Sequence, residues 1–250
     1  MSCSSYDEAA PPPATADAGT VDGGEAGSDS SGPIDAGNDA RGPFCASFSP
    51  APLFCADFDE GKPFNYGFTD FAGDFAIDPT TFTSPPSSLL VRGVDGGDVF
   101  MVRSVDALTT TSLHLGFSIR WGTDDAGPPP GGIPMRLNDS AVNDCSFFFI
   151  KVRDGAWFVE IDANRPDAMR TQDAYAMPLF PVDRTWSRVE LVVEQTSPDV
   201  VSASVIVDGQ ISVSPKATDC RGLGHPEVTV GAQYSTSGTL DLDDVVLTQR

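Results

Sequence analysis

The sequence predicts an all-β protein in which residues 44–250 form a two-sheet antiparallel sandwich. Glycine and proline are abundant, with 24 and 21 residues, and this excess favours frequent turns over long helices. Apolar and polar residues alternate along most of residues 44–250, as in strands with one buried face. Two pairs of such runs are joined by Asp-Gly, a typical hairpin turn.

Residues 1–43 predict a disordered acidic linker ahead of this domain. The segment is mostly Gly, Ala, Ser, Asp and Pro, with eight acidic residues and one basic residue. It cannot bury enough apolar surface to offset the entropy of ordering, and its charges repel one another. Cys3, followed by two serines, resembles the start of a mature bacterial lipoprotein. We therefore expect lipidation at Cys3 and an outer-membrane or extracellular location.

The charge excludes whole classes of partner. Fifteen Lys and Arg against 36 Asp and Glu give a net charge of -21. A protein of this charge does not bind nucleic acid or an anionic membrane through its own surface. No apolar run approaches the roughly 18 residues of a membrane span. Membrane contact is therefore expected only through a lipid anchor, and the oligomeric state is left open.

The two Asp-Gly hairpins give the clearest strands. One joins runs on either side of Asp154-Gly155, and the other joins runs on either side of Asp208-Gly209. Period two assigns one face of each strand to the core, and about ten to twelve strands are expected. The residues predicted to face the core are Leu113, Leu115, Phe117, Ile119, Trp121, Trp157, Val159, Ile161, Val189, Leu191, Val193, Ala203, Val205 and Val207.

Four cysteines in the domain predict two disulfides. Cys45, Cys55, Cys145 and Cys220 allow three pairings. The short, proline-containing segment between Cys45 and Cys55 favours their bridge, which would leave Cys145 to pair with Cys220. Disulfides indicate an oxidising compartment, in agreement with export.

Several motifs carry a family resemblance. They are F-C-A-D-F-D-E-G near residue 54, S-P-P-S-S-L-L-V-R-G near residue 84, T-W-S-R-V-E-L-V-V-E near residue 185, I-V-D-G-Q near residue 206 and L-D-L-D-D-V-V-L near residue 240. Together they resemble the laminin G-like, concanavalin A-type lectin and glucanase jelly roll over residues 44–250. The Asp-Ala-Gly and Asp-Gly-Gly repeats before them are similar to surface lipoproteins of myxobacterial type. The resemblance implies a jelly-roll sandwich, and fold alone assigns no function.

The strongest enzymatic motif is Glu160-Ile161-Asp162-Ala163-Asn164. Laminarinase-type glucanases of this fold carry three acids on one strand face, as nucleophile, pKa-tuning Asp and general acid. Here Glu160 and Asp162 match, while Asn164 and Arg165 stand where the acid would be. An amide cannot protonate a leaving oxygen, so we expect no active glycosidase.

Sugar binding needs an aromatic plane beside polar groups. Phe158 shares a strand face with Glu160 and Asp162, whereas Trp157 faces the core. The residues predicted to bind a ligand are Phe158, Glu160, Asp162, Asn164, Arg120 and Tyr175.

Acidic clusters near both ends of the domain predict a structural calcium ion. Asp57 and Asp59 lie in the first strand region, and Asp243 and Asp244 lie in the last. Terminal strands often lie side by side in related modules, and calcium prefers oxygen ligands. The competing interpretation is ordinary solvation of a sheet edge.

The sequence thus predicts an exported, lipid-anchored surface protein whose jelly roll binds a glycan or a cell-surface protein without catalysis. One alternative is a laminarinase-type glycoside hydrolase that uses Glu160 and Asp162, and another is a structural or adhesion spacer. His114 and His225, the only histidines, are interpreted as surface residues because no serine elbow accompanies them. His114 is expected on the polar face of a strand, and His225, before Pro226, in a glycine-rich turn.

Overall fold

Fifteen strands and one short 3₁₀ turn make up the regular structure of the described residues in this computed structural model. The described residues are 44–59, 66–93, 99–106, 110–122, 135–139, 143–151, 157–164, 170–180, 184–220, 223–232 and 238–250. Within these ranges, no helix has the length and apolar character needed to cross a bilayer. The linker and Cys3 lie outside them, so linker disorder, the domain boundary and lipidation stay predictions.

The elements follow one another along the chain with few long interruptions. In order they are η1 (Phe44–Ser47), β1 (Phe54–Ala56), β2 (Asp70–Ala72), β3 (Asp74–Asp78), β4 (Ser88–Gly93), β5 (Val99–Ser104), β6 (Ser112–Gly122), β7 (Met135–Asp139), β8 (Asn143–Lys151), β9 (Trp157–Asn164), β10 (Arg170–Met177), β11 (Ser187–Ser197), β12 (Val200–Val207), β13 (Gln210–Asp219), β14 (His225–Ala232) and β15 (Gly238–Gln249).

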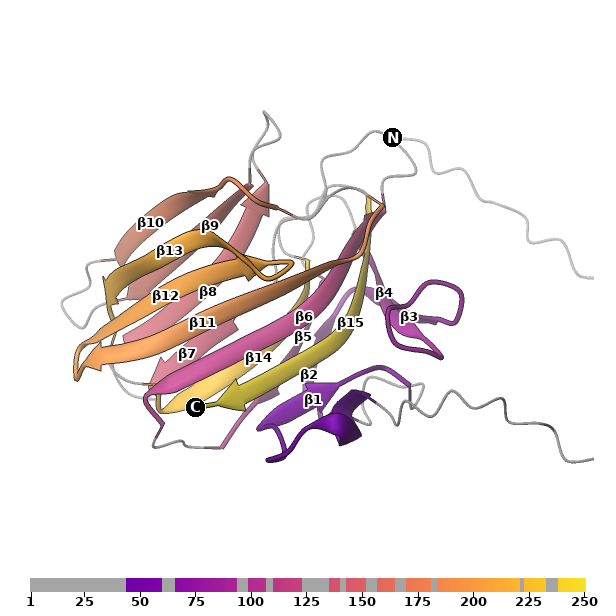
Figure 1. The fold of residues 1–250 in the computed structure, drawn as a ribbon, viewed down its shortest axis with the longest axis horizontal. Helices are drawn as coiled ribbons and strands as arrows, with labels where there is room; N and C mark the ends of the chain where they lie inside the picture. The colour runs from indigo at the N-terminus through magenta and orange to yellow at the C-terminus, as the bar shows by residue number, and fades with distance from the viewer. Residues whose placement is uncertain are drawn as a thin grey trace, which may run out of the picture. The chain divides into compact units, whose positions relative to one another are not determined.

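Two antiparallel sheets are stacked face to face, which confirms the predicted sandwich. The eight-stranded sheet runs β13-β12-β11-β6-β15-β4-β3, with β1 paired to β15, and the seven-stranded sheet runs β10-β9-β8-β7-β14-β5-β2. Figure 1 shows β10, β9, β8 and β7 in a layer behind β13, β12, β11 and β6. The last strand, β15, lies between β6 and β4 inside the eight-stranded sheet, and the first strand, β1, pairs with it.

The core between the sheets contains the residues that the period-two pattern predicted. All fourteen residues predicted to face inward are buried. Trp121 of β6 and Trp157 of β9 meet across the sandwich with ring centroids 4.6 Å apart. Because the two sheets contribute alternate residues of each strand, one continuous apolar layer stabilises the fold.

The strand number exceeds the predicted ten to twelve because three N-terminal strands are short. β1, β2 and β3 contain 3, 3 and 5 residues. A run of this length shows too few alternations for a period-two pattern to stand out. These strands lie at the ends or edges of the sheets, where pairing to one neighbour holds them.

The Asp208-Gly209 hairpin forms as predicted. β12 pairs antiparallel with β13, and Asp208 and Gly209 have φ values of 49° and 77°. Positive φ at both central residues is the requirement of a tight turn that matches the twist of the strands. β8 and β9 also pair antiparallel, although Asp154-Gly155 between them lies outside the described residues.

Both predicted disulfides are present. Cys45 bonds to Cys55 and Cys145 bonds to Cys220, with Cα–Cα distances of 5.7 and 6.0 Å. The first closes a short loop and fixes η1 beside β1. The second joins β8 to the end of β13, so it links the two sheets.

Replacing Cys145 and Cys220 together with serine is expected to lower the free energy of unfolding by about 4 kcal/mol. The bond closes a loop with a sequence separation of 75 residues, and a loop of that length restricts the unfolded chain strongly. Urea unfolding of the double variant and the parent measures the difference. A loss below about 1 kcal/mol would contradict this account of the bridge.

Candidate functional site

A polar row crosses the outer face of the seven-stranded sheet, meaning the face directed away from the core. Directly opposed residues of antiparallel strands share a face, and the register pairs residues on six neighbouring strands. From β5 to β10 the row is Ser104, Glu227, Arg136, Ser146, Asp162 and Gln172.

Burial divides this row into a covered centre and open ends. Ser146 and Asp162 are 8% and 5% exposed, whereas Ser104 and Gln172 are exposed and Glu227 is half-buried. The Oγ of Ser104 donates to Glu227 Oε1 at 3.5 Å. Buried Asp162 is therefore closed to a substrate.

His225 begins β14 and is exposed. Its Cα partner on β7 is Asn138, one row along from the pair Glu227 and Arg136. Because His225 is two residues from Glu227, it lies on the same outer face. The sequence placed His225 in a glycine-rich turn. The alternation that continues through Val228 and Val230 was the signal that the strand starts earlier.

Phe158 and Glu160 form a second part of the outer face, on β9. Both are half-buried, and exposed Ala176 and Ala174 lie opposite them on β10. The Nε2 of Gln172 donates a hydrogen bond to Glu160 Oε1. An apolar ring, two small side chains and a carboxylate–amide pair therefore lie together.

The structure brings three of the six predicted ligand residues together and separates others. Phe158, Glu160 and Asp162 share the outer face of β9, as predicted from period two. Arg120 instead lies on the eight-stranded sheet, where its Nη1 is 2.9 Å from Asp241 Oδ2. Tyr175 faces the other side of β10, packs against the core and has Lys216 Nζ 5.2 Å from its ring centroid.

Asn164, the sixth predicted ligand residue, ends β9 and has Arg170 of β10 as its Cα partner. The register therefore places its backbone next to the polar row. It stays a predicted ligand residue.

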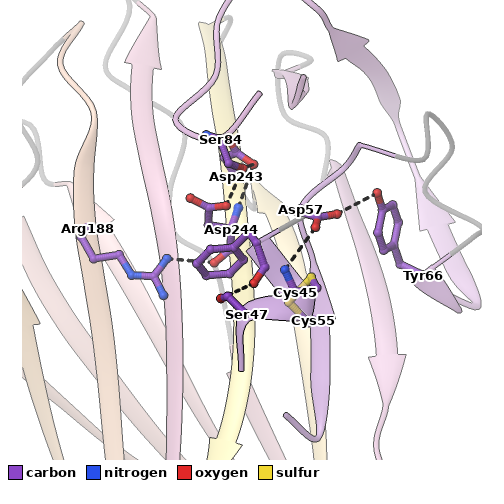
Figure 2. The surroundings of a disulfide bond; sticks show 10 residues. Cys45, Ser47, Cys55, Asp57, Tyr66, Ser84, Arg188, Asp243 and Asp244 are labelled. Carbon is purple, nitrogen blue, oxygen red and sulfur yellow. Dashed lines mark hydrogen bonds between the residues drawn. A yellow bond between two sulfur atoms is a disulfide. The ribbon is translucent and has the colours of Figure 1, made fainter. Parts of the chain in front are cut away.

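The opposite face of the sandwich carries a charged cluster of buried and half-buried residues, of which Figure 2 shows Arg188, Asp243 and Asp244. We call the group Arg188, Ser118, Asp243, Asp244 and Phe44 the Arg188 cluster. Arg188 Nη1 donates to the carbonyl oxygen of Asp244 at 2.8 Å and to Ser118 Oγ at 3.5 Å. Its guanidinium carbon lies 5.7 Å from the centroid of the Phe44 ring. Burial lowers the pKa of Arg188, and Asp244 opposes that shift.

Gly116 gives this arginine its space on β6. A Cβ at residue 116 would lie 2.4 Å from Arg188 Nη2. The guanidinium therefore crosses β6 at the position that has no side chain. A larger residue at position 116 would displace Arg188 from the cluster.

Asp243 and Asp244 fasten the segment around Thr83 and Ser84 to β15. Asp243 Oδ2 accepts the backbone N–H groups of Thr83 and Ser84 at 2.8 and 3.0 Å. Asp244 Oδ1 accepts from Ser84 Oγ at 2.6 Å. These carboxylates serve as hydrogen-bond acceptors for a connection between strands.

The predicted calcium ligands are only partly brought together. β1 pairs with β15, and Ala56 lies opposite Val245. Asp57, the next residue after Ala56, is therefore near the β15 segment that contains Asp243 and Asp244. Asp57 accepts from Cys45 N and Tyr66 Oη, each at 3.3 Å (Figure 2). No set of three or more His, Cys, Asp or Glu side chains in the described part of the chain is arranged to hold a metal ion. Asp59 is half-buried, and calcium binding stays a prediction.

Asp243 gives the domain a pH-dependent stability. Burial, with the neighbouring Asp244 charge, raises its pKa to about 7. As the pH rises, Asp243 therefore loses its proton in the unfolded state before it does so in the folded state. Its contribution to the free energy of unfolding is full below about pH 4 and falls as the pH rises towards 7. The amide introduced by Asp243→Asn does not titrate. As the pH rises over that range, we expect the free energy of unfolding of this variant to increase relative to that of the parent by up to about 1.4 kcal/mol per pH unit.

Unfolding both proteins in urea at several pH values measures this difference. The difference in free energy of unfolding should level off above the pKa that Asp243 has in the folded protein. A difference that is independent of pH would contradict a raised pKa for Asp243. Asp208→Asn, at the exposed hairpin turn, is the control.

Solved structures with the same fold include polysaccharide lyases. No protein-family model matches the chain, and no curated protein matches it. The endo-β-1,4-glucuronan lyase of the fungus Trichoderma reesei is 13% identical, with TM-score 0.56, over 80% of this chain and 96% of that one. The PL-14 alginate lyase of Aplysia kurodai is 10% identical, with TM-score 0.52, over 80% and 99%. Cellulose induced protein Cip1 is 14% identical, with TM-score 0.51, over 78% and 97%.

These likenesses confirm the jelly-roll sandwich but not the narrower laminin G-like, concanavalin A-type assignment. They also overturn the prediction of a non-catalytic domain that binds a glycan or a protein. Two of the three similar structures are named as polysaccharide lyases, which are catalytic proteins. The glycoside hydrolase alternative with Glu160 and Asp162 is corrected with it, because the enzymes named among these similar structures are lyases and not hydrolases, and the spacer alternative is not pursued.

Proposed function

We propose that the domain is a polysaccharide lyase that cleaves chains containing uronic acid by β-elimination. The observation that carries the proposal is exposed His225 beside the polar row, on a sheet of the fold shared with glucuronan and alginate lyases. A sheet face of several strands also offers the length that a polymeric substrate requires.

β-Elimination needs a base next to a uronate carboxylate. The base takes the proton from the carbon that bears the carboxylate, and the electron pair forms a carbon–carbon double bond. The glycosidic oxygen on the adjacent carbon leaves and takes up a proton, so no water is consumed. A histidine serves both steps, since the imidazolium formed first returns its proton to the leaving oxygen.

His225 suits this role better than the acids on the same face. A carboxylate base such as Glu227 would be repelled by the carboxylate of the substrate, whereas a neutral imidazole is not. The register positions beside His225 and Glu227 are occupied by Asn138 and Arg136. A guanidinium is a type of group that can balance a uronate charge, and an amide is a type that can donate a hydrogen bond to it; both effects make the neighbouring proton more acidic.

A spectroscopic assay tests the proposal. The purified domain is incubated with glucuronan, alginate, polygalacturonate, hyaluronan and gellan, and the ultraviolet absorbance of unsaturated uronate ends is followed. We expect absorbance to rise on at least one of them while chain length falls. Chain shortening without new absorbance would contradict the lyase proposal, and so would the absence of cleavage of all these uronate polymers.

Raising the salt concentration is expected to lower KM and leave kcat nearly unchanged. The chain carries a net charge of -21, so it repels a polyanionic substrate at long range. The screening length shortens from about 30 Å at 0.01 M salt to about 10 Å at 0.1 M. Initial rates at the two salt concentrations give KM and kcat. A KM that increases with salt would instead indicate that the site attracts uronates through net positive charge.

We also propose that the domain is exported. The two disulfides support this because such bonds persist in oxidising compartments. A glycan polymer outside the cell is then within reach, and labelling of Cys3 by a fatty-acid analogue would test the lipid anchor.

A further inference from the structure

Phe158 and Glu160 lie three strands away from His225 on the same outer face. The sheet order β9-β8-β7-β14 separates their strands by about 14 Å at the usual strand spacing, and the register offsets both residues from His225 along the strands as well. A sugar over Phe158 is therefore distant from the bond that His225 would break. Any preference exerted there concerns a unit of the polymer other than the one that loses the proton.

The apolar part of this region fits the face of a sugar ring. Phe158 is half-buried, and the residues opposite it and Glu160 on β10 are the exposed alanines Ala176 and Ala174. Small side chains leave room beside the aromatic ring, and the CH face of a pyranose packs on such a surface.

The polar part of the region disfavours a charged sugar. Glu160 is half-buried and accepts a hydrogen bond from Gln172. Asp162, two residues along on the same face, is a second carboxylate and is buried. Like charges repel, whereas the hydroxyl groups of a neutral sugar can donate to Glu160.

We propose that Phe158, Glu160 and Gln172 form a subsite for a neutral sugar, which makes the substrate a polysaccharide that combines uronate with neutral units. This inference rests on the proposed lyase function and narrows its substrate class. It separates this chain from enzymes that act on an uninterrupted polyuronate, because each repeat would then place a carboxylate against Glu160.

A comparison of two substrate types tests the subsite. Hyaluronan and gellan contain neutral sugars between uronates, whereas glucuronan and polymannuronate contain uronates alone. We expect kcat/KM of the parent to be about tenfold higher on the better mixed polymer, the effect of one charge-assisted contact. Glu160→Gln should reduce this preference several-fold, mainly through KM. A parent that prefers the uronate homopolymers, or a preference unchanged in Glu160→Gln, would overturn the subsite.

Glu194→Gln is the matched control. Glu194 is exposed on β11 of the other sheet, so its replacement removes the same charge without touching the outer face. An equal change in both variants would mean that net charge, and not the subsite, sets the preference, and would overturn the inference.

Direct binding separates this inference from the lyase proposal. Titration calorimetry with cellohexaose, mannohexaose and laminarihexaose, and with a glucuronan hexasaccharide, needs no cleavage. Binding of a neutral hexasaccharide that is lost in Phe158→Ala supports the subsite even if no polymer is cleaved. Cleavage without such binding, or binding only of the uronate, leaves the lyase proposal standing and overturns the subsite.

Discussion

Replacing Arg188 with methionine is expected to lower the free energy of unfolding by about 3–5 kcal/mol. Methionine keeps much of the length that fills the space between Phe44 and Gly116 but has no charge and no N–H. The carbonyl of Asp244 loses a donor at 2.8 Å, and the buried carboxylates of Asp243 and Asp244 lose the favourable interaction with the charge of Arg188. A buried charge without compensation is the costly outcome of breaking such a cluster.

The pH dependence of this loss identifies its cause. At low pH Asp243 is protonated, because its pKa is about 7 in the folded protein, so the loss should be smaller at pH 5 than at pH 8. Arg92→Met is the control, since Arg92 pairs with Asp74 in an exposed ion pair of the kind worth about 0–1 kcal/mol. Urea unfolding of both variants makes the comparison. Equal losses in the two variants would contradict the structural role of Arg188.

Replacing His225 with glutamine is expected to reduce kcat by a factor of about 10²–10⁴, the usual contribution of a general acid–base group. Glutamine preserves a polar side chain of similar size but cannot take a proton at neutral pH. KM should change little, because His225 is assigned to the chemical step and not to chain binding. The measurement is the initial rate of unsaturated-end formation on the best uronate polymer.

His114→Gln is the matched control for that experiment. His114 is half-buried on β6 of the other sheet, so it is remote from the polar row. Its variant should retain the activity of the parent. A similar loss in both variants, or full activity in His225→Gln, would remove His225 from the proposed mechanism.

The core was predictable from the sequence because a strand imposes a strict period. Leu113, Leu115 and Phe117 alternate with Gly116 and His114, and only one register buries the apolar set. The Asp208-Gly209 turn was equally readable, since its backbone requires residues that tolerate positive φ.

The grouping of site residues was harder to predict because it depends on which strands become neighbours. Phe158, Glu160 and Asp162 lie on one strand, so period two is enough to predict that they share a face. Arg120 was assigned to the same site, yet β6 lies in the other sheet. No period in the sequence reports strand order, which is set by pairing between distant segments.

The Arg188 cluster shows the same limit for charged residues. Because Val189 faces the core, period two places Arg188 on the opposite face of the strand. Arg188 does lie there, but its guanidinium is next to the Phe44 ring and over Gly116. A segment more than a hundred residues earlier in the chain provides that ring. Alternation predicts the side of a strand on which a residue lies, but it cannot predict which distant segment packs against that side.

The mass of the products tests the central claim of β-elimination most directly. A defined oligosaccharide containing uronate is cleaved by the domain, and the product masses are measured. The account predicts that the masses of the two fragments add up to the mass of the substrate and that one fragment carries a double bond. Fragments that together exceed the substrate by one water per broken bond would show hydrolysis and contradict it.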